Sequence, residues 1–317
     1  MPAARGACVK KRSTGRAGGF PSGACPKWSK KVKIAELYKQ NRKSLSFEIF
    51  PPKKDTELES IDETLEVLCE LKPDFISVTF GAGGGSNCNR TIEIAKNIKS
   101  RYGVEPVVHL TSLHYDKKEI DEFANVMEAE GIENILALRG DRTPKIAEKD
   151  DFHHASDLIS YLSEKHDFCF LGACYPECHP ESDGKVNDLK GLRKKVDAGA
   201  EVLLSQLFFD NEKFYDFCER CRIGGIDVPI IPGIMPVINA AQIRRMLSLC
   251  NATFPERFNR IVRKYEDRKE ALFDAGMSYA LSQIIDLLAS DIPGIHLYTM
   301  NNPAVARRIC EGIRNIV

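Results

Sequence analysis

The chain has 317 residues, 43% of them hydrophobic, and its 45 basic and 45 acidic residues cancel. No run approaches the roughly 18 apolar residues that cross a bilayer, which argues against a membrane span. Twelve of the basic residues and a single acid fall within residues 1–43, so the remainder holds 33 basic against 44 acidic residues, and this acidic body argues against nucleic acid as its main partner.

Residues 1–33 mix Gly, Ser, Pro, Lys and Arg without apolar periodicity, which predicts a basic, disordered extension. This extension lacks the apolar core of a signal peptide. A transit peptide, a nucleic-acid-binding arm, a solvated tail and a start codon placed upstream all fit such a composition. We expect one folded domain to occupy residues 34–317.

The stretch from Ser44 to Pro52, SLSFEIFPP, predicts a β-strand that carries one carboxylate. Alternation places Ser46 and Glu48 on one face. The strand must end at Pro51, because proline has no N–H to donate to a neighbouring strand. A carboxylate at the C-terminal end of a barrel strand is a candidate catalytic group, whereas on a surface strand it is only a solvated charge.

From Lys33 onward, short β-rich runs alternate with amphipathic stretches, the pattern of repeated βα units. The predicted strands are Leu45–Phe50, Phe75–Phe80, Val107–Thr111, Ile135–Arg139, Phe168–Tyr175, Val202–Phe209, Pro229–Met235 and Ile295–Met300. The predicted helices are Leu58–Leu71, Thr91–Tyr102, Lys117–Glu130, Ser156–Lys165, Leu189–Ala198, Asn211–Arg222, Ala240–Cys250, Pro255–Tyr265, Arg268–Ala289 and Ala304–Ile316.

Eight such units predict an α/β fold of the TIM (β/α)8 barrel type, which typically has about 250 residues. A doubly wound open sheet is the alternative. The helical stretches between the seventh and eighth strands exceed what a barrel needs, so we expect an extra helix before the last strand. In a TIM barrel, the chemistry lies at the C-terminal ends of the strands.

Polar side chains follow the second, third and fourth predicted strands. Thr79 is followed by a glycine run, GAGGGS, whose backbone can approach a ligand or can form a flexible loop. His109, Arg139 and Asp141 are costly to bury together without a ligand. Arg139 and Asp141 could also form a salt bridge at the rim.

The ends of the fifth and sixth strands carry groups suited to a flat heteroaromatic ligand. Tyr175 and His179 can stack and donate hydrogen bonds, and the amide of Gln206 both donates and accepts. Lys194 and Lys195, on the following predicted helix, could reach a diphosphate or could simply be solvated.

The eleven cysteines include a CxxC pair, Cys218 and Cys221, and the neighbours Cys174, Cys178 and His179. Zinc is the functional alternative, but no second pair completes four ligands. We expect no metal and treat the cysteines as buried hydrophobic residues. Their odd number, without a secretory signal, favours a reducing cytoplasm.

Nine motifs in register resemble the methylenetetrahydrofolate reductase family, a family of flavoprotein TIM barrels. They cover about Ser44 to Asn301 and read SFEIFPPK, SVTFGAGG, VVHLT, NILALRGD, ACYPECHPE, LKGLRKKVDAGA, SQLFFD, IIPGIMP and HLYTMN. The resemblance is to the short form that has only the catalytic domain. It implies FAD-dependent reduction of 5,10-methylenetetrahydrofolate to 5-methyltetrahydrofolate by ping-pong hydride transfer from NADH or NADPH, which feeds methionine synthesis and one-carbon metabolism.

The resemblance also implies roles for individual residues. Glu48 is the general acid that opens the folate ring, and Asp141 lies near both flavin and folate. The folate and nicotinamide contacts are Thr79, Asp141, Gln206 and Gln242. The flavin contacts are Phe80, Ala82, His109, Arg139, Gly140, Asp141, Ala155, Tyr175, His179, Asp188, Lys194 and Lys195.

Two departures from the family pattern stand out. Asn302 occupies the place of an arginine that often meets the folate glutamate tail, and Cys178 stands beside His179 without a role in the family chemistry. The alternatives are another flavin- or phosphate-binding barrel, or a subunit that receives electrons from a partner protein. The resemblance favours NADH and a homo-oligomer.

Overall fold

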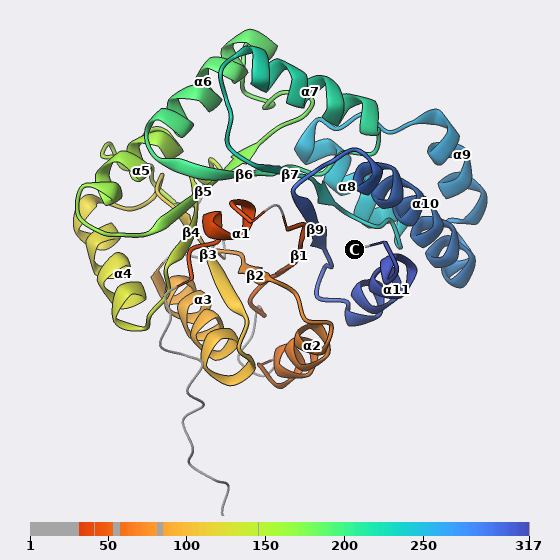
Figure 1. The fold of residues 1–317 in the computed structure, drawn as a ribbon, viewed down its shortest axis with the longest axis horizontal. Helices are drawn as coiled ribbons and strands as arrows, with labels where there is room; N and C mark the ends of the chain where they lie inside the picture. Colours follow the sequence, from red (N-terminus) through yellow and green to blue (C-terminus); the bar gives the residue numbers. More distant parts are fainter. Residues whose placement is uncertain (1–31, 41, 53–57, 81–84, 145, 317) are drawn as a thin grey trace, which may run out of the picture. The chain divides into compact units, whose positions relative to one another are not determined.

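The computed structural model describes residues 32–40, 42–52, 58–80, 85–144 and 146–316 (Figure 1). The predicted extension, except for Val32 and Lys33, lies outside these residues, as does Ala82. Val32 and Lys33 are held to the barrel: the Val32 N–H donates to Glu133 Oε2 at 2.7 Å, and Lys33 pairs with Asp167. No helix in the described ranges is long and apolar enough to cross a membrane.

One parallel sheet forms the centre of the molecule, with the strand order β7-β6-β5-β4-β3-β2-β1-β9-β8. The two ends of this order, β7 and β8, are separated by one residue in the chain, so the sheet curls into a barrel, and the doubly wound alternative is wrong. The strands are β1 (Ser44–Ile49), β2 (Phe75–Val78), β3 (Glu105–Thr111), β4 (Asn134–Leu138), β5 (Cys169–Cys174), β6 (Ala200–Ser205), β7 (Ile230–Ile231), β8 (Gly233–Ile234) and β9 (Gly294–Tyr298).

The predicted seventh strand is split at Pro232 into β7 and β8. Ile231 pairs with Leu204 of β6, and Gly233 pairs with His296 of β9. Proline has no N–H to donate, but the Pro232 carbonyl accepts from the His296 N–H at 3.0 Å. Residues 230–234 therefore span the gap between β6 and β9. The fold is a TIM-type barrel.

Helices surround the barrel in Figure 1, and three of them lie between β8 and β9, where the sequence predicts the additional helical stretches. A short π-helix, η3 (Ile98–Tyr102), continues α3 where the sequence predicts one uninterrupted helix. The helices are α2 (Leu58–Glu70), α3 (Gly85–Asn97), α4 (Lys117–Ala129), α5 (Ala155–Ser163), α6 (Lys185–Asp197), α7 (Asn211–Ile223), α8 (Ala240–Cys250), α9 (Glu256–Tyr265), α10 (Lys269–Ala289) and α11 (Pro303–Ile313).

The amino-terminal end of the barrel is closed by a short helix that the sequence analysis missed, α1 (Ala35–Tyr38), which lies over the centre of the ring in Figure 1. The Ile34 N–H donates to Asn134 Oδ1 at 2.8 Å, at the start of β4. The Ile34 side chain is fully buried in an apolar cluster that fills the half of the barrel nearest the amino-terminal ends of the strands, here called the lower half. The inward-facing strand residues of this cluster are Phe75, Val107, Leu136, Cys169, Leu171, Val202, Leu204 and Ile231.

Candidate active site

The upper half of the barrel interior, nearest the carboxyl-terminal ends of the strands, is polar. Glu48 lies there between His109 and His296. Its Oε2 is 3.5 Å from His109 Nε2 and 3.9 Å from His296 Nε2, and the carboxylate side chain is only 13% exposed. The register explains this grouping, because Ser46 and Glu48 of β1 lie opposite His296 and Tyr298 of β9. The alternation in SLSFEIFPP therefore places Glu48 inside the barrel, at the C-terminal end of its strand.

His109 faces Glu48 as a neutral imidazole. Burial lowers the pKa of His109 to about 4, the charge of Glu48 opposes this change, and His296 adds to it. At neutral pH the contact at 3.5 Å therefore joins a carboxyl group and an uncharged ring, and it is not an ion pair.

His296 is fixed on both sides. Its ring stacks on Phe75, with centroids 6.0 Å apart and planes 16° apart, and Nδ1 lies 2.8 Å from Ser46 Oγ. The Ser46 hydroxyl also donates to the Ile295 carbonyl at 3.3 Å. The other ring nitrogen, Nε2, faces the Glu48 carboxyl group.

Three polar atoms in this half of the barrel are buried and have no hydrogen-bond partner among the described residues: Ser77 Oγ, His109 Nε2 and His296 Nε2. Ser77 lies opposite Glu48 in the β1–β2 pairing. Native proteins satisfy most buried polar atoms, so three unsatisfied atoms around one carboxylate indicate a site that a ligand completes.

Arg139, at the end of β4, pairs with Glu181. The sequence analysis offers a salt bridge with Asp141 as an alternative. The two terminal guanidinium nitrogens donate to the carboxylate of Glu181 at 2.6 and 2.8 Å, and Nε donates to the Gly140 carbonyl at 3.1 Å. Asp141 is exposed at the rim. Gly140 has φ +94, and a Cβ there would lie 3.1 Å from Thr111 Cβ, so the chain turns closely at this point.

Tyr175 and His179, which follow β5, contact each other edge to face, with centroids 4.6 Å apart. The Glu181 N–H donates to His179 Nδ1 at 3.1 Å, which leaves the proton of a neutral ring on Nε2. Burial, and then the charge of Arg139, lower the pKa of His179. The His179 N–H donates to Asp188 Oδ1 at 3.2 Å, and burial raises the pKa of Asp188.

The two adjacent lysines of α6 differ in environment. Lys195 donates from Nζ to the Ala173 carbonyl, and its stem crosses Gly172, where a Cβ would lie 2.6 Å from Lys195 Cδ. Burial lowers the pKa of Lys195. Lys194 is exposed.

The other predicted contacts are distributed around the barrel. The Thr79 N–H donates to the Ile49 carbonyl at 3.0 Å, Gln206 Oε1 accepts from the Leu207 N–H at 2.9 Å, and Gln242 lies in the first turn of α8. Phe80 lies in apolar surroundings. Phe80 packs edge-on against Tyr115 with centroids 5.7 Å apart, and Ala155 is buried at the start of α5.

Asn302 has a structural role that an arginine could not fill. It is the N-cap of α11, and its Oδ1 accepts from the Ala304 N–H at 3.1 Å.

The cysteines considered for a zinc site pack among apolar side chains. Cys174, Cys218 and Cys221 belong to an apolar cluster with Leu192 and Phe217. Burial raises the pKa of Cys218 to about 11 and that of Cys221 to about 12, so both remain thiols. Within the described part of the chain, no group of three or more His, Cys, Asp or Glu residues could hold a metal ion.

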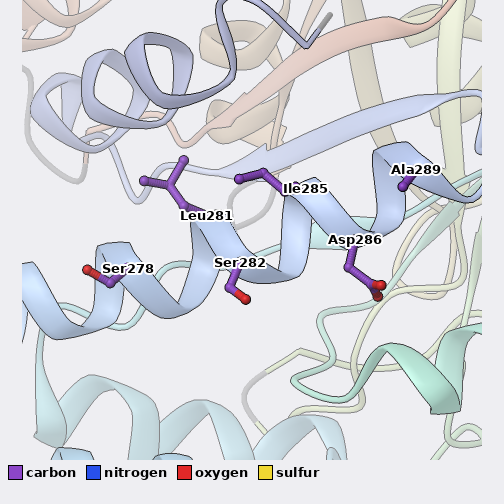
Figure 2. Close-up of a pocket in the computed structure, with 6 residues that line it drawn as sticks. All are labelled: Ser278, Leu281, Ser282, Ile285, Asp286 and Ala289. Carbon is purple, nitrogen blue, oxygen red and sulfur yellow. The ribbon is translucent and has the colours of Figure 1, made fainter.

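The pocket in Figure 2 is separate from this site. Its lining residues all come from one helix outside the barrel, α10: Ser278, Leu281, Ser282, Ile285, Asp286 and Ala289. It contains none of the residues at the strand ends. We place the candidate active site at the mouth of the barrel, because Glu48 and the unsatisfied polar atoms lie there.

The sequence analysis singled out neither His296, Ser77 nor Glu181. A signal existed for the first two, because a histidine and a serine stand in otherwise apolar strand patterns, on the same strand faces as Tyr298 and Thr79. No local signal identifies Glu181, since its partner Arg139 is 42 residues away in the sequence.

A family model described as methylenetetrahydrofolate reductase matches residues 33–314. The chain belongs to this family. It is 38% identical to the 5,10-methylenetetrahydrofolate reductase of Pectobacterium carotovorum subsp. carotovorum over 89% of this chain and 93% of that protein. It is 36% identical to the Escherichia coli (strain K12) enzyme, over 89% and 94% of the two chains. The protein is therefore a methylenetetrahydrofolate reductase, an oxidoreductase.

Solved structures agree on the fold. A Clostridium thermocellum protein, described as binding two copies of 5-methyl-5,6,7,8-tetrahydrofolic acid, has a TM-score of 0.62 and 13% identity over 90% of this chain and 99% of that chain. A tryptophan synthase chain from M. tuberculosis has a TM-score of 0.50 at 13% identity, over 88% and 95% of the two chains. At such low identity, these similarities show only the barrel.

Proposed function

We propose that this reductase uses FAD to convert 5,10-methylenetetrahydrofolate to 5-methyltetrahydrofolate with NAD(P)H, by ping-pong hydride transfer, and that Glu48 is its general acid. The observation that carries the proposal is the position of the Glu48 carboxyl group, between His109 and His296 in the polar half of a family barrel.

The residues at the ends of β4 and β5 fit FAD. Arg139 supplies positive charge for a diphosphate, Lys195 places its Nζ at the Ala173 carbonyl near the end of β5, the Nε2–H of His179 is a donor, and Tyr175 offers a flat ring. The close turn at Gly140 allows a ligand to approach the backbone. We propose that these residues hold the cofactor, together with Asp188, Lys194 and the buried His109. When bound, FAD supplies a carrier that accepts hydride from the nicotinamide and returns it to the folate.

Glu48 is placed to hold a proton and deliver it to a folate ring nitrogen. Its carboxyl group lies 3.5 Å from the neutral ring of His109 and 3.9 Å from Nε2 of His296, and only 13% of its side chain is exposed. A general acid must lie within reach of the atom that it protonates, and the C-terminal end of β1 is where a ligand at the barrel mouth would meet this carboxyl group.

The first test separates the two half-reactions of Glu48→Gln by anaerobic flavin absorbance. Reduction of the flavin by NADH should survive, because no proton from Glu48 is needed there. Oxidation of the reduced flavin by the folate should slow by at least about 100-fold, the usual contribution of a general acid.

The matched control is Glu201→Gln, which changes a carboxylate near the amino-terminal end of β6 and should leave both rates unchanged. Equal losses in the two half-reactions of Glu48→Gln would reject the role of Glu48. The same absorbance trace, recorded with NADH and then with NADPH, identifies the donor, and we propose NADH.

A further inference from the structure

The pairing between Arg139 and Glu181 occupies the cation that the proposed FAD site offers. Both terminal nitrogens of the guanidinium donate to the two oxygens of one carboxylate, at 2.6 and 2.8 Å. The same two-pronged geometry is the one by which arginine binds phosphate. Glu181 thus holds the position that suits an anionic ligand.

The carboxylate of Glu181 is charged throughout the working pH range. Its hydrogen bonds from Arg139 hold the pKa of Glu181 at about 2. The two partners differ in burial, since the Arg139 side chain is 19% exposed and that of Glu181 is 46% exposed. Arg139 therefore stays with the barrel, and Glu181 is the partner that can move away into solvent.

The connection that carries Glu181 is built around bends. It runs from the end of β5 to the start of α6, and φ is +84 at Cys178 and +91 at Gly184. Within it, the Glu181 N–H donates to His179 Nδ1 at 3.1 Å. A displacement of Glu181 would thus be felt by His179, which the proposed function also assigns to the flavin.

We propose that Glu181 competes with the diphosphate of FAD for Arg139, so that cofactor binding displaces its carboxylate and Glu181 sets the flavin affinity. This inference rests on the proposed function. A diphosphate and a carboxylate repel each other when both approach one guanidinium. An exposed ion pair is weak enough to be exchanged, and its removal should tighten binding by roughly three- to fivefold.

The test measures the dissociation constants of flavin-stripped, full-length protein by fluorescence quenching, with ADP measured by competition against FAD. Glu181→Gln should bind FAD and ADP roughly three- to fivefold more tightly, because both carry a diphosphate. Riboflavin, which has no phosphate, should bind Glu181→Gln and the unaltered protein equally. Glu181→Asp keeps the charge but shortens the side chain, so its FAD affinity should lie between that of Glu181→Gln and that of the unaltered protein.

The matched control is Asp183→Asn, which removes the same charge from an exposed position two residues along the same connection. It should change FAD affinity by less than about twofold. Weaker FAD binding by Glu181→Gln would overturn the proposal and make Glu181 an organiser of Arg139. Equal effects on riboflavin, equal effects of Asp183→Asn, or no change would also overturn it. If the unaltered protein binds no FAD at all, the proposed function itself fails.

Discussion

The two halves of the barrel interior are built from the same strands but differ in chemistry. The lower half is filled by apolar side chains, such as Phe75 and Leu204, and is covered by Ile34. The upper half holds Glu48, His109 and His296, with unsatisfied polar atoms around the carboxyl group.

This difference separates stability from function along a single axis. Apolar burial in the lower half stabilises the barrel, at roughly 25 cal/mol per Å². Each buried polar atom without a partner costs about 1–3 kcal/mol in the upper half. The lower half therefore compensates for the cost of the polar atoms in the upper half that have no partner among the described residues.

The largest expected effect comes from emptying the lower half. Ile34→Ala removes a fully buried side chain from beneath the strands, and should reduce the free energy of unfolding by about 2–5 kcal/mol. Urea denaturation measures this loss.

At a temperature where the variant is folded, its two half-reactions should keep their rates, because Ile34 is remote from Glu48. Glu36→Ala, at an exposed position of the same short helix, should leave unfolding unchanged. A slowed half-reaction in folded Ile34→Ala would show that the two halves are coupled.

The next effect depends on pH and comes from the upper half. His109 has a pKa of about 4 in the folded protein and about 6.5 when unfolded, so the unfolded state binds more protons between these values. The stability that His109 contributes is present above pH 6.5 and is lost as the pH falls toward 4.

His109→Gln should remove this dependence, which amounts to about 2 kcal/mol between pH 6.5 and 5. The measurement is urea denaturation across that range, with exposed His153→Gln as the control. If His109→Gln and the unaltered protein lose stability in parallel, burial of His109 is not the cause.

The smallest effect should have the opposite sign. Ser77→Ala removes a buried hydroxyl group that has no partner among the described residues, and should raise the free energy of unfolding by about 1 kcal/mol. Ser44→Ala, on the neighbouring strand, removes a buried hydroxyl bonded to Tyr38 at 2.8 Å, and should lower it by about 1 kcal/mol. Losses of equal size in both variants would mean that Ser77 is already satisfied without a ligand.

Much of the fold is predictable because the strands and helices carry strong local patterns. The alternation around Glu48 and the eight β-rich runs predict the barrel and the face of its first strand. Short features escape such patterns. The helix Ala35–Tyr38 has too few residues to show a period, and the break at Pro232 depends on which neighbours the seventh strand must reach.

The site is predictable only where a residue departs from the local sequence pattern. Glu48 is a charge in an apolar run, and the burial that makes His109 neutral follows from its place in a strand. The partner of Arg139 is not predictable in this way, because Asp141 is near in sequence whereas Glu181 reaches Arg139 only through the folded β5–α6 connection. The remaining roles of individual residues stay predictions.

The pairing of β1 with β9 has a consequence for how the protein is made. Ser46 lies opposite His296, 250 residues later, so the barrel cannot close until β9 has left the ribosome. Until then, the first strand presents an open edge, the kind of surface that chaperones protect from aggregation. The surroundings of Glu48 are thus assembled late during synthesis, and a growing chain stays inactive until β9 has paired with β1.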